Sequence, residues 1–159
     1  KTKIYIKKID KDIEFPKIID KGEWIDLRAS GDYEIKRGDL GKIPLGVAIK
    51  IPKGYELNIL PRSSTPLHFK VLLANSQGIG DYTFSGNKDE YQFVFYALRS
   101  TKIKHNSRIC QFRISLSQKA TVWQKLKWLF SNGIELIEVD NLSEVNRGGI
   151  GSTGIDNIR

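Results

Sequence analysis

Cysteine and histidine are scarce in this chain of 159 residues, which contains one cysteine, Cys110, and two histidines. A single thiol excludes an internal disulfide framework and is typical of a reducing compartment, so we predict a cytoplasmic protein. So few nitrogen and sulfur ligands also exclude a conventional zinc site. Any metal must therefore be held by carboxylates or by the phosphates of a substrate, which favours Mg²⁺.

Long hydrophobic runs are absent as well. No apolar stretch approaches the roughly 20 residues that cross a bilayer. Residues 1–20 alternate charged and apolar side chains and lack the apolar block of a signal peptide. With 40% hydrophobic and 28% charged residues, the composition is that of one ordinary globular domain without a membrane partner.

The net charge of +8 favours an anionic partner, such as a nucleotide, a nucleic acid or a lipid headgroup. The basic residues are scattered along the chain, however, and no nucleic-acid-binding motif accompanies them. A solvated basic surface explains the charge equally well. We predict no nucleic-acid partner.

Short runs of β-branched and aromatic residues dominate the chain, separated by turn signals such as Ser30-Gly31-Asp32 and Pro52-Lys53-Gly54. Strands are predicted over 3–7, 42–51, 55–60, 69–74, 91–98, 108–116 and 134–139. Many short strands at this spacing predict an all-β fold, a distorted jelly-roll barrel of the β-clip type, over residues 1–142.

One segment breaks the β pattern. Residues 121–130 place Val122, Leu126, Leu129 and Phe130 on one face of a short amphipathic helix, inside an insertion at about 117–133. This helix either packs on its own barrel, the interpretation we favour, or forms a docking or membrane-surface element anchored by its tryptophans. The glycine-rich stretch 143–159 is predicted to form a C-terminal arm.

Four features could carry chemistry. The arginine and two hydroxyls of Arg62-Ser63-Ser64 suit a phosphate cradle. The glycine-rich residues 147–154 could wrap their amides around a polyphosphate, although they do not form a Walker loop. Asp26 and Asp81 could hold a metal-bound water or activate an attacking water, and Asn75 could recognise a pyrimidine edge. Taken singly, each is as well explained by an ordinary turn, a flexible tail or a solvated side chain.

Taken in order, these segments resemble the five motifs of the trimeric dUTPase family, most closely the prophage-type dUTPases of Bacillus and its relatives. The matching stretches are GEWIDLRA (22–29), PRSST (61–65), NSQGIGDYTFSG (75–86), SRICQF (107–112) and NRGGIGSTG (146–154). The connecting segment PLGVAIKIPKGYE (44–56) also resembles the family. The resemblance spans nearly the whole chain.

The resemblance implies a homotrimer that hydrolyses dUTP to dUMP and pyrophosphate, with each active site shared between subunits. Asp81 is then the base that activates the water attacking the α-phosphorus, and it also accepts a hydrogen bond from the sugar 3′-hydroxyl. Asp26 binds Mg²⁺ through a water, and Gln111 contacts the phosphates or the attacking water.

The remaining implied contacts are to the nucleotide itself. Asn75 and the backbone of Gly78 and Ile79 read the uracil edge in a hairpin too narrow for a 5-methyl group. Contacts to the phosphates are implied for Arg62, Ser63 and Ser64, and for Arg147, Gly151, Ser152 and Thr153 of a closing lid.

Three positions depart from the family pattern. Gly80 replaces the usual isoleucine before the catalytic aspartate, which we expect to loosen the hairpin. Phe84 replaces the tyrosine that packs under the deoxyribose; it keeps the ring and loses the phenol, for which Tyr82 is a candidate substitute. Ile150 replaces a phenylalanine that stacks on uracil.

Two other functions fit the same scaffold. A dCTP deaminase shares the fold, but its glutamate base is matched only loosely by Glu90. A regulatory protein on a dUTPase scaffold, which binds a repressor or another protein partner, would suit the Gly80 and Phe84 replacements and the tryptophan-bearing insertion.

Overall fold

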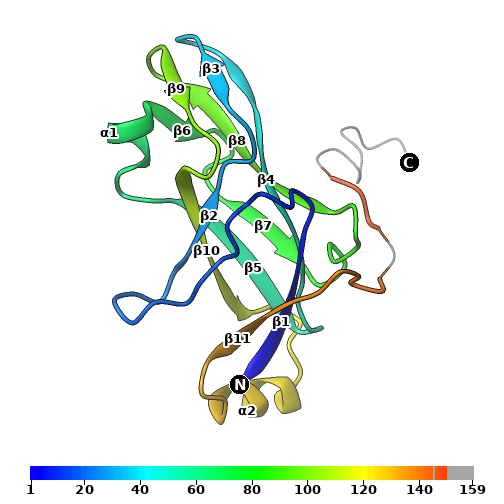
Figure 1. Ribbon diagram of the computed structural model, residues 1–159. Helices are drawn as coiled ribbons and strands as arrows, with labels where there is room; N and C mark the ends of the chain where they lie inside the picture. The colour runs from blue at the N-terminus through cyan, green and yellow to red at the C-terminus, as the bar shows by residue number, and fades with distance from the viewer. Residues whose placement is uncertain (145, 150–159) are drawn as a thin grey trace, which may run out of the picture.

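The computed structural model describes residues 1–144 and 146–149, and it contains two short helices among many strands (Figure 1). The strands are β1 (Thr2–Lys8), β2 (Ile25–Arg28), β3 (Tyr33–Ile35), β4 (Leu40–Lys50), β5 (Tyr55–Pro61), β6 (Val71–Leu73), β7 (Gly78–Asp81), β8 (Glu90–Ala97), β9 (Thr101–Ile103), β10 (Arg108–Leu116) and β11 (Ile134–Glu138). The helices are α1 (Thr65–Phe69) and α2 (Val122–Leu129). The predicted all-β fold is confirmed.

The strands form two main sheets. One sheet has the order β11-β1-β4-β8-β6 and the other the order β2-β10-β5-β7, while β3 and β9 form a separate pair. β11 runs parallel to β1, so that the last strand closes beside the first (Figure 1). All other strand pairs are antiparallel.

The core lies between the two sheets and follows from the alternation of apolar residues. In β1 the side chains of Ile4 and Ile6 are buried while their neighbours face outward. β8 alternates in the same way, which turns Tyr91, Phe93 and Phe95 inward. Strand alternation therefore decides which aromatic side chains reach the interior.

The sequence-based strands are close to the observed ones, with two differences. The predicted strand 69–74 is reduced to β6, because residues 65–69 form helix α1, in which Pro66 lies at the helix start. The amides of the first helical turn have no partner inside the helix, so a proline there costs no hydrogen bond, and its fixed φ suits the helix. The short strands β2, β3, β7 and β9 were not predicted.

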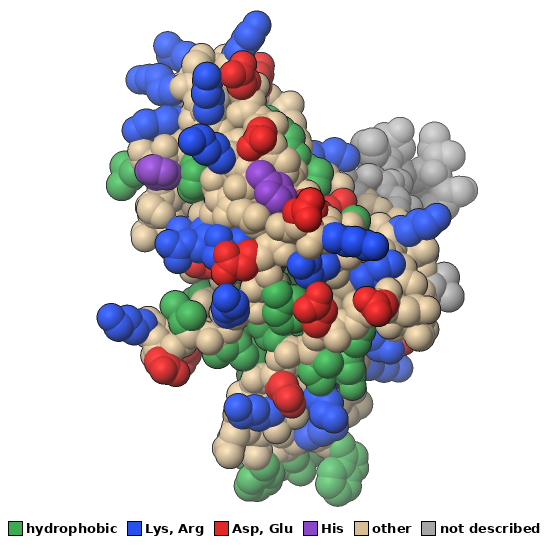
Figure 2. All heavy atoms as spheres, viewed as in Figure 1, with side chains coloured by type: hydrophobic (Ala, Val, Ile, Leu, Met, Phe, Trp, Pro, Cys, Tyr) green, Lys and Arg blue, Asp and Glu red, His purple; other side chains and the backbone are tan. Residues whose placement is uncertain are grey.

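Helix α2 is confirmed, but the expected packing of its apolar face on the barrel is wrong. Thr121 caps its start through a reciprocal pair of bonds with Gln124. Only Trp128 packs inward, with its ring 5.4 Å from that of Tyr55. Apolar side chains gather at this end of the molecule (Figure 2). The exposed apolar residues of segment 121–130 are Val122, Trp123, Leu126, Leu129 and Phe130.

Cys110 lies in the core of β10 and its side chain is fully buried. Burial in an apolar environment raises the pKa of its thiol. The residue therefore behaves as a small apolar core side chain. No helix in the described part of the chain has the length and apolar character needed to cross a membrane.

Candidate active site

Two arginines flank a single carboxylate where β2, β5 and β10 lie side by side. The Nε atom of Arg62 lies 3.0 Å from one oxygen of Asp26, and a terminal nitrogen of Arg108 lies 3.4 Å from the other. Gln111 sits opposite Asp26 in the register of β10 with β2, and its amide donates to the carbonyl of Pro61 at 3.2 Å. We call these four residues, Asp26, Arg62, Arg108 and Gln111, the arginine cluster. Two guanidinium groups against one carboxylate leave a net positive charge, which suits an anionic ligand.

The turn that presents Arg62 is held by one buried side chain. The hydroxyl of Thr65 accepts the amide of Arg62 at 2.9 Å and donates to the carbonyl of Ile109 at 2.7 Å. Ser63 is exposed, and the hydroxyl of Ser64, the residue before α1, accepts no hydrogen bond from the helix amides. Both hydroxyls are thus placed beside the arginine cluster without a role in folding the turn.

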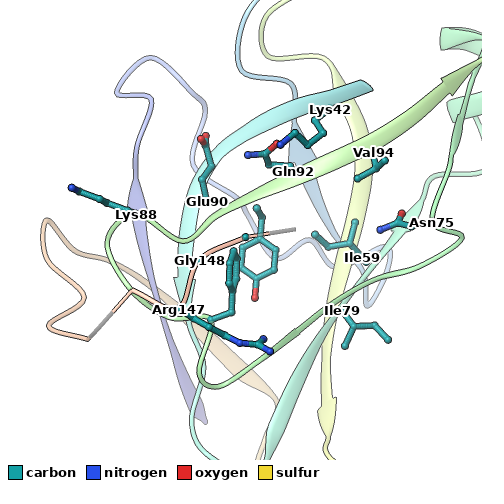
Figure 3. A pocket seen from close by; sticks show the side chains of 14 residues that line it. Lys42, Ile59, Asn75, Ile79, Lys88, Glu90, Gln92, Val94, Arg147 and Gly148 are labelled. Carbon is teal, nitrogen blue, oxygen red and sulfur yellow. The ribbon is translucent and has the colours of Figure 1, made fainter. Parts of the chain in front are cut away.

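A second site lies around β7, which pairs with β5 at the opposite edge of the second sheet from β2. An open cavity of about 600 Å³ is lined by Asn75, Gly78 and Ile79, from the segment predicted to form the uracil-binding hairpin, and by Phe84 after it. In Figure 3 Asn75 and Ile79 lie on one side of this cavity and Arg147 and Gly148 on the other. We call this space the hairpin cavity. Its lining combines apolar side chains and backbone with the amides of Asn75 and Gln92 and with charged side chains such as Arg147, which suits a planar heterocycle and a sugar.

Asp81 ends β7 and is held in its conformation by local bonds. One carboxylate oxygen accepts the amide of Thr83 at 2.8 Å and also the hydroxyl of Thr83. The other lies 3.7 Å from the guanidinium of Arg147. Desolvation alone would raise the pKa of Asp81, but the Thr83 bonds, the Arg147 charge and the Phe84 amide together hold it below its ordinary value. The carboxylate is therefore ionised and partly exposed, ready to accept a proton or a hydrogen bond.

Asp89 anchors the beginning of the C-terminal segment. Its buried carboxylate accepts the amide of Arg147 at 2.8 Å, the amide of Gly148 at 3.0 Å and the amide of Gly86 at 3.0 Å. Asn146 adds a bond from the amide of Lys88 at 2.7 Å. These contacts fix the backbone of residues 146–148 over the turn that follows Asp81, and they bring Arg147 to the hairpin cavity.

Within one chain the arginine cluster and Asp81 lie at opposite ends of β5. Asp81 pairs with Glu56, at the start of the strand, whereas Gln111 pairs with Leu60 and Arg62 follows its end. Six residue-to-residue steps lead from Glu56 to Arg62, which corresponds to about 20 Å of extended strand. The two sites of a single chain therefore cannot both contact one phosphorus atom.

Comparison with known proteins identifies the family. The family model for dUTPase matches residues 24–127. The SPbeta prophage-derived deoxyuridine 5′-triphosphate nucleotidohydrolase YosS of Bacillus subtilis is 46% identical over 136 residues, which cover 86% of this chain and 87% of that protein. The chain belongs to the dUTPase family.

Solved dUTPases share the fold at lower identity. The dUTPase of Streptococcus mutans superposes with a TM-score of 0.64 at 21% identity, covering 73% of this chain and 98% of that one. A mutant dUTPase from phage phi11 of S. aureus superposes with a TM-score of 0.65 at 11% identity, covering 75% and 94%. The latter is described as coordinating a structural Mg(II) ion.

Most of the predicted site residues of this dUTPase fall into the two sites described. Asp26, Arg62 and Gln111 belong to the arginine cluster, while Asn75 and Phe84 line the hairpin cavity. The predicted lid residues Gly151, Ser152 and Thr153, and Ile150 beside them, lie outside the described residues. The structure brings Asp81 and Arg147 together, and it separates both from the arginine cluster.

Tyr82 does not substitute for the phenol missing at Phe84. Its ring is exposed and lies under the ammonium group of Lys53, 5.8 Å away. The chain turns between residues 81 and 84, so simple strand alternation does not apply there. The ring of Phe84 instead packs edge-to-face against Tyr91, with centroids 5.0 Å apart.

Four residues at these sites were not singled out from the sequence. Arg108 lies within the motif SRICQF (107–112), and its positive charge in that motif could have indicated it. Thr83 follows Asp81 by two residues, a spacing typical of a side chain that caps a turn. Asp89 and Tyr91 have no local signal, because their roles depend on contacts with the C-terminal segment and with β7.

The arginine cluster fits a magnesium ion only in combination with a phosphate ligand. Among residues 1–144 and 146–149 no group of three or more His, Cys, Asp or Glu side chains could hold a metal by itself. A carboxylate offers about four lone-pair positions, so Asp26 can still accept a hydrogen bond from a metal-bound water while it contacts both arginines. Mg²⁺ commonly keeps several waters and takes phosphate oxygens as ligands.

Proposed function

We propose that this dUTPase hydrolyses dUTP to dUMP and pyrophosphate by attack of a water molecule on the α-phosphorus. The observation that carries the proposal is the pair of complementary sites. One is a cavity whose lining residue Arg147 lies 3.7 Å from the ionised carboxylate of Asp81, and the other is an arginine cluster suited to a polyphosphate. The B. subtilis relative named as a deoxyuridine triphosphate nucleotidohydrolase is 46% identical to this chain over 136 residues.

Asp81 is the proposed general base. Its lowered pKa keeps the carboxylate ionised at neutral pH, and the bonds from Thr83 fix the orientation of one oxygen. The other oxygen can orient the attacking water and accept its proton. A positioned general base of this kind typically accelerates a reaction by about 10²–10⁴-fold.

The arginine cluster is the proposed phosphate site. Arg62 and Arg108 balance the charge of the polyphosphate, and the hydroxyls of Ser63 and Ser64 donate to its oxygens. Gln111 donates to a phosphate oxygen or to the attacking water. Bound Mg²⁺, held through a water on Asp26, supplies further neutralisation of the leaving pyrophosphate.

The hairpin cavity is the proposed nucleoside site. The side chain of Asn75 and the backbone of Gly78 and Ile79 pair with the edge of uracil, so that cytosine leaves donors and acceptors mismatched. The close backbone on both sides of the hairpin excludes the 5-methyl group of thymine. The ring of Phe84 packs under the sugar and opposes a 2′-hydroxyl group.

The distance between the two sites supports a homotrimer with shared active sites. Asp81 and Arg62 of one chain are separated by most of the length of β5. One bound nucleotide must therefore contact the general base Asp81 of one subunit and the arginine cluster of another. A closed trimer repeats this contact three times. The lid, residues 147–154, then closes over the β- and γ-phosphates.

Pyrophosphate release from dUTP tests the proposed function. Purified protein with Mg²⁺ is expected to release one pyrophosphate per dUTP and to leave dTTP, dCTP and UTP largely intact. Omission of Mg²⁺ with EDTA present should lower the rate by at least about tenfold, because the polyphosphate charge is then neutralised by side chains alone. Ammonia released from dCTP in place of pyrophosphate from dUTP would assign the chain to the deaminase reaction instead.

A further inference from the structure

Helix α2 carries its apolar side chains on the side that faces away from the protein. Trp123 and Phe130 are each 81% exposed, and Leu129 is 73% exposed. Val122 and Leu126 are exposed too, and at about 3.6 residues per turn all of these positions fall on one side of the helix. We call Val122, Trp123, Leu126, Leu129 and Phe130 the α2 apolar face. In Figure 2 apolar side chains project from this end of the molecule.

The opposite side of α2 is fixed to the barrel. The ring of Trp128 packs on that of Tyr55 at 5.4 Å, and the side-chain amide of Gln124 donates to the carbonyl of Lys53 at 2.9 Å. Gln124 also joins Thr121 in the reciprocal cap at the start of the helix. A rotation that buried the α2 apolar face would break the contacts to Tyr55 and Lys53. The exposure of this face therefore follows from how the helix is attached.

The edges of the α2 apolar face are basic. Lys125 and Lys127 are exposed and lie on either side of the face around the helix axis. Lys119 is exposed in the segment that leads to the helix. Residues 91–134 contain no aspartate or glutamate, and the first acidic residue after α2 is Glu135 in β11. The surface therefore combines a bare apolar centre with a positive rim.

The basic rim decides between two occupants of this surface. A second copy of the chain would place lysines against lysines at the edges of the contact, and like charges brought together oppose association. An anionic lipid bilayer matches both parts of the surface. Its headgroup boundary accepts tryptophan, phenylalanine and leucine side chains, and its phosphates attract lysines.

We propose that the α2 apolar face binds an anionic lipid bilayer, with Trp123 and Phe130 inserted at the headgroup boundary and Lys125 and Lys127 against the lipid phosphates. Such peripheral binding needs no membrane-spanning segment. The sequence-based prediction of no membrane partner rests on the absence of long apolar runs, so it does not bear on a helix of this kind. No residue of the α2 apolar face lines the hairpin cavity or belongs to the arginine cluster.

Vesicle flotation measures this binding with the whole chain. The parent protein is expected to float with vesicles of phosphatidylcholine and phosphatidylglycerol in equal parts, to bind phosphatidylcholine alone much more weakly, and to dissociate as salt screens the lysines. Trp123→Ala combined with Phe130→Ala should lower the partition coefficient at least about tenfold, because two large apolar side chains no longer leave water. Lys125→Gln and Lys127→Gln should each lower it about fivefold.

Leu129→Ala and Leu67→Ala form a matched pair. Both leucines are exposed to a similar degree, 73% and 75%, but Leu67 lies in α1, at the other end of the molecule (Figure 1). Leu129→Ala should weaken vesicle binding about 3- to 10-fold, whereas Leu67→Ala should leave it unchanged. All these variants should keep the melting temperature, the sedimentation coefficient and the rate of pyrophosphate release of the parent, because the replaced side chains lie outside the core.

Three results would overturn lipid binding through this face. The parent protein could fail to float with the anionic vesicles at low salt, the variant with Trp123→Ala and Phe130→Ala could float like the parent, or Leu67→Ala could lose as much binding as Leu129→Ala. A lower sedimentation coefficient of the double variant would also contradict the proposal, because it would make the face a contact between subunits. Pyrophosphate release is measured without lipid. A parent that floats but releases no pyrophosphate from dUTP therefore contradicts the proposed function alone.

Discussion

Replacement of Asp81 by alanine is expected to lower kcat for dUTP by about 10²–10⁴-fold, the usual contribution of a general base. Binding of dUTP should weaken much less than kcat falls, because the variant keeps every proposed phosphate and uracil contact and loses only the contact to the sugar 3′-hydroxyl. The loss also removes the charge partner of Arg147, 3.7 Å away, which can tighten binding of the anionic substrate. Steady-state kinetics and calorimetry on the inactive variant measure the two effects separately.

Asp39→Ala is a suitable control for this prediction. It removes a carboxylate from an exposed turn, where it accepts only the amide of Lys36, and it should leave kcat within about twofold of the parent. If Asp81→Ala hydrolysed dUTP at close to the parental rate, another group would have to be the base. If it lost binding and turnover together, Asp81 would act mainly in holding the nucleotide.

Truncation before Asn146 is the second change with a large expected effect. It should lower kcat/KM for dUTP by at least about 10²-fold, because charge stabilisation from Arg147 and from the lid amides is lost. The barrel should stay folded, since the described residues of this segment, 146–149, are all exposed and contribute nothing to the core. Activity assays, the melting temperature and the sedimentation coefficient together test these expectations.

Arg147→Ala divides the effect of the truncation into its parts. It removes one guanidinium and keeps the amide bonds of residues 147 and 148 to Asp89, so its activity should lie between those of the parent and the truncated chain. Full activity of the truncated protein would show that residues 146–159 do not close over the substrate. A loss of the trimer on truncation would assign the segment a role in assembly.

The sequence predicts the strands of this fold well where apolar residues alternate over a sufficient length. β10 has the expected bounds, and the bounds of β1, β4, β5 and β8 differ from expectation by at most two residues at either end. β2 and β7 were not predicted, because a strand of four residues carries too little periodicity. Helix α2 was predicted from its amphipathic pattern, yet the side that packs is decided by Trp128 against Tyr55.

The residues of the two sites could be predicted where a motif contains them, but contacts between distant segments could not. The motifs indicated Asp26, Arg62 and Gln111 individually, and the pairing of β2, β10 and β5 explains why they come together. The contact between Gly80 and Tyr91 joins two sheets and has no counterpart in local sequence. The same holds for Asp89, whose partners are almost 60 residues further along the chain.

The most direct test of the shared site mixes two defective subunits, Asp81→Ala and Arg62→Ala, each expected to lose most of its own activity. The two are unfolded together, refolded at equal concentration and assayed for pyrophosphate release from dUTP. If each site takes Arg62 from one chain and Asp81 from another, random assembly gives about one quarter of the sites both intact residues, and about one quarter of the parental rate returns. If both residues served the same site from one chain, every site would keep one defect, and the mixture would be no more active than the two variants measured separately.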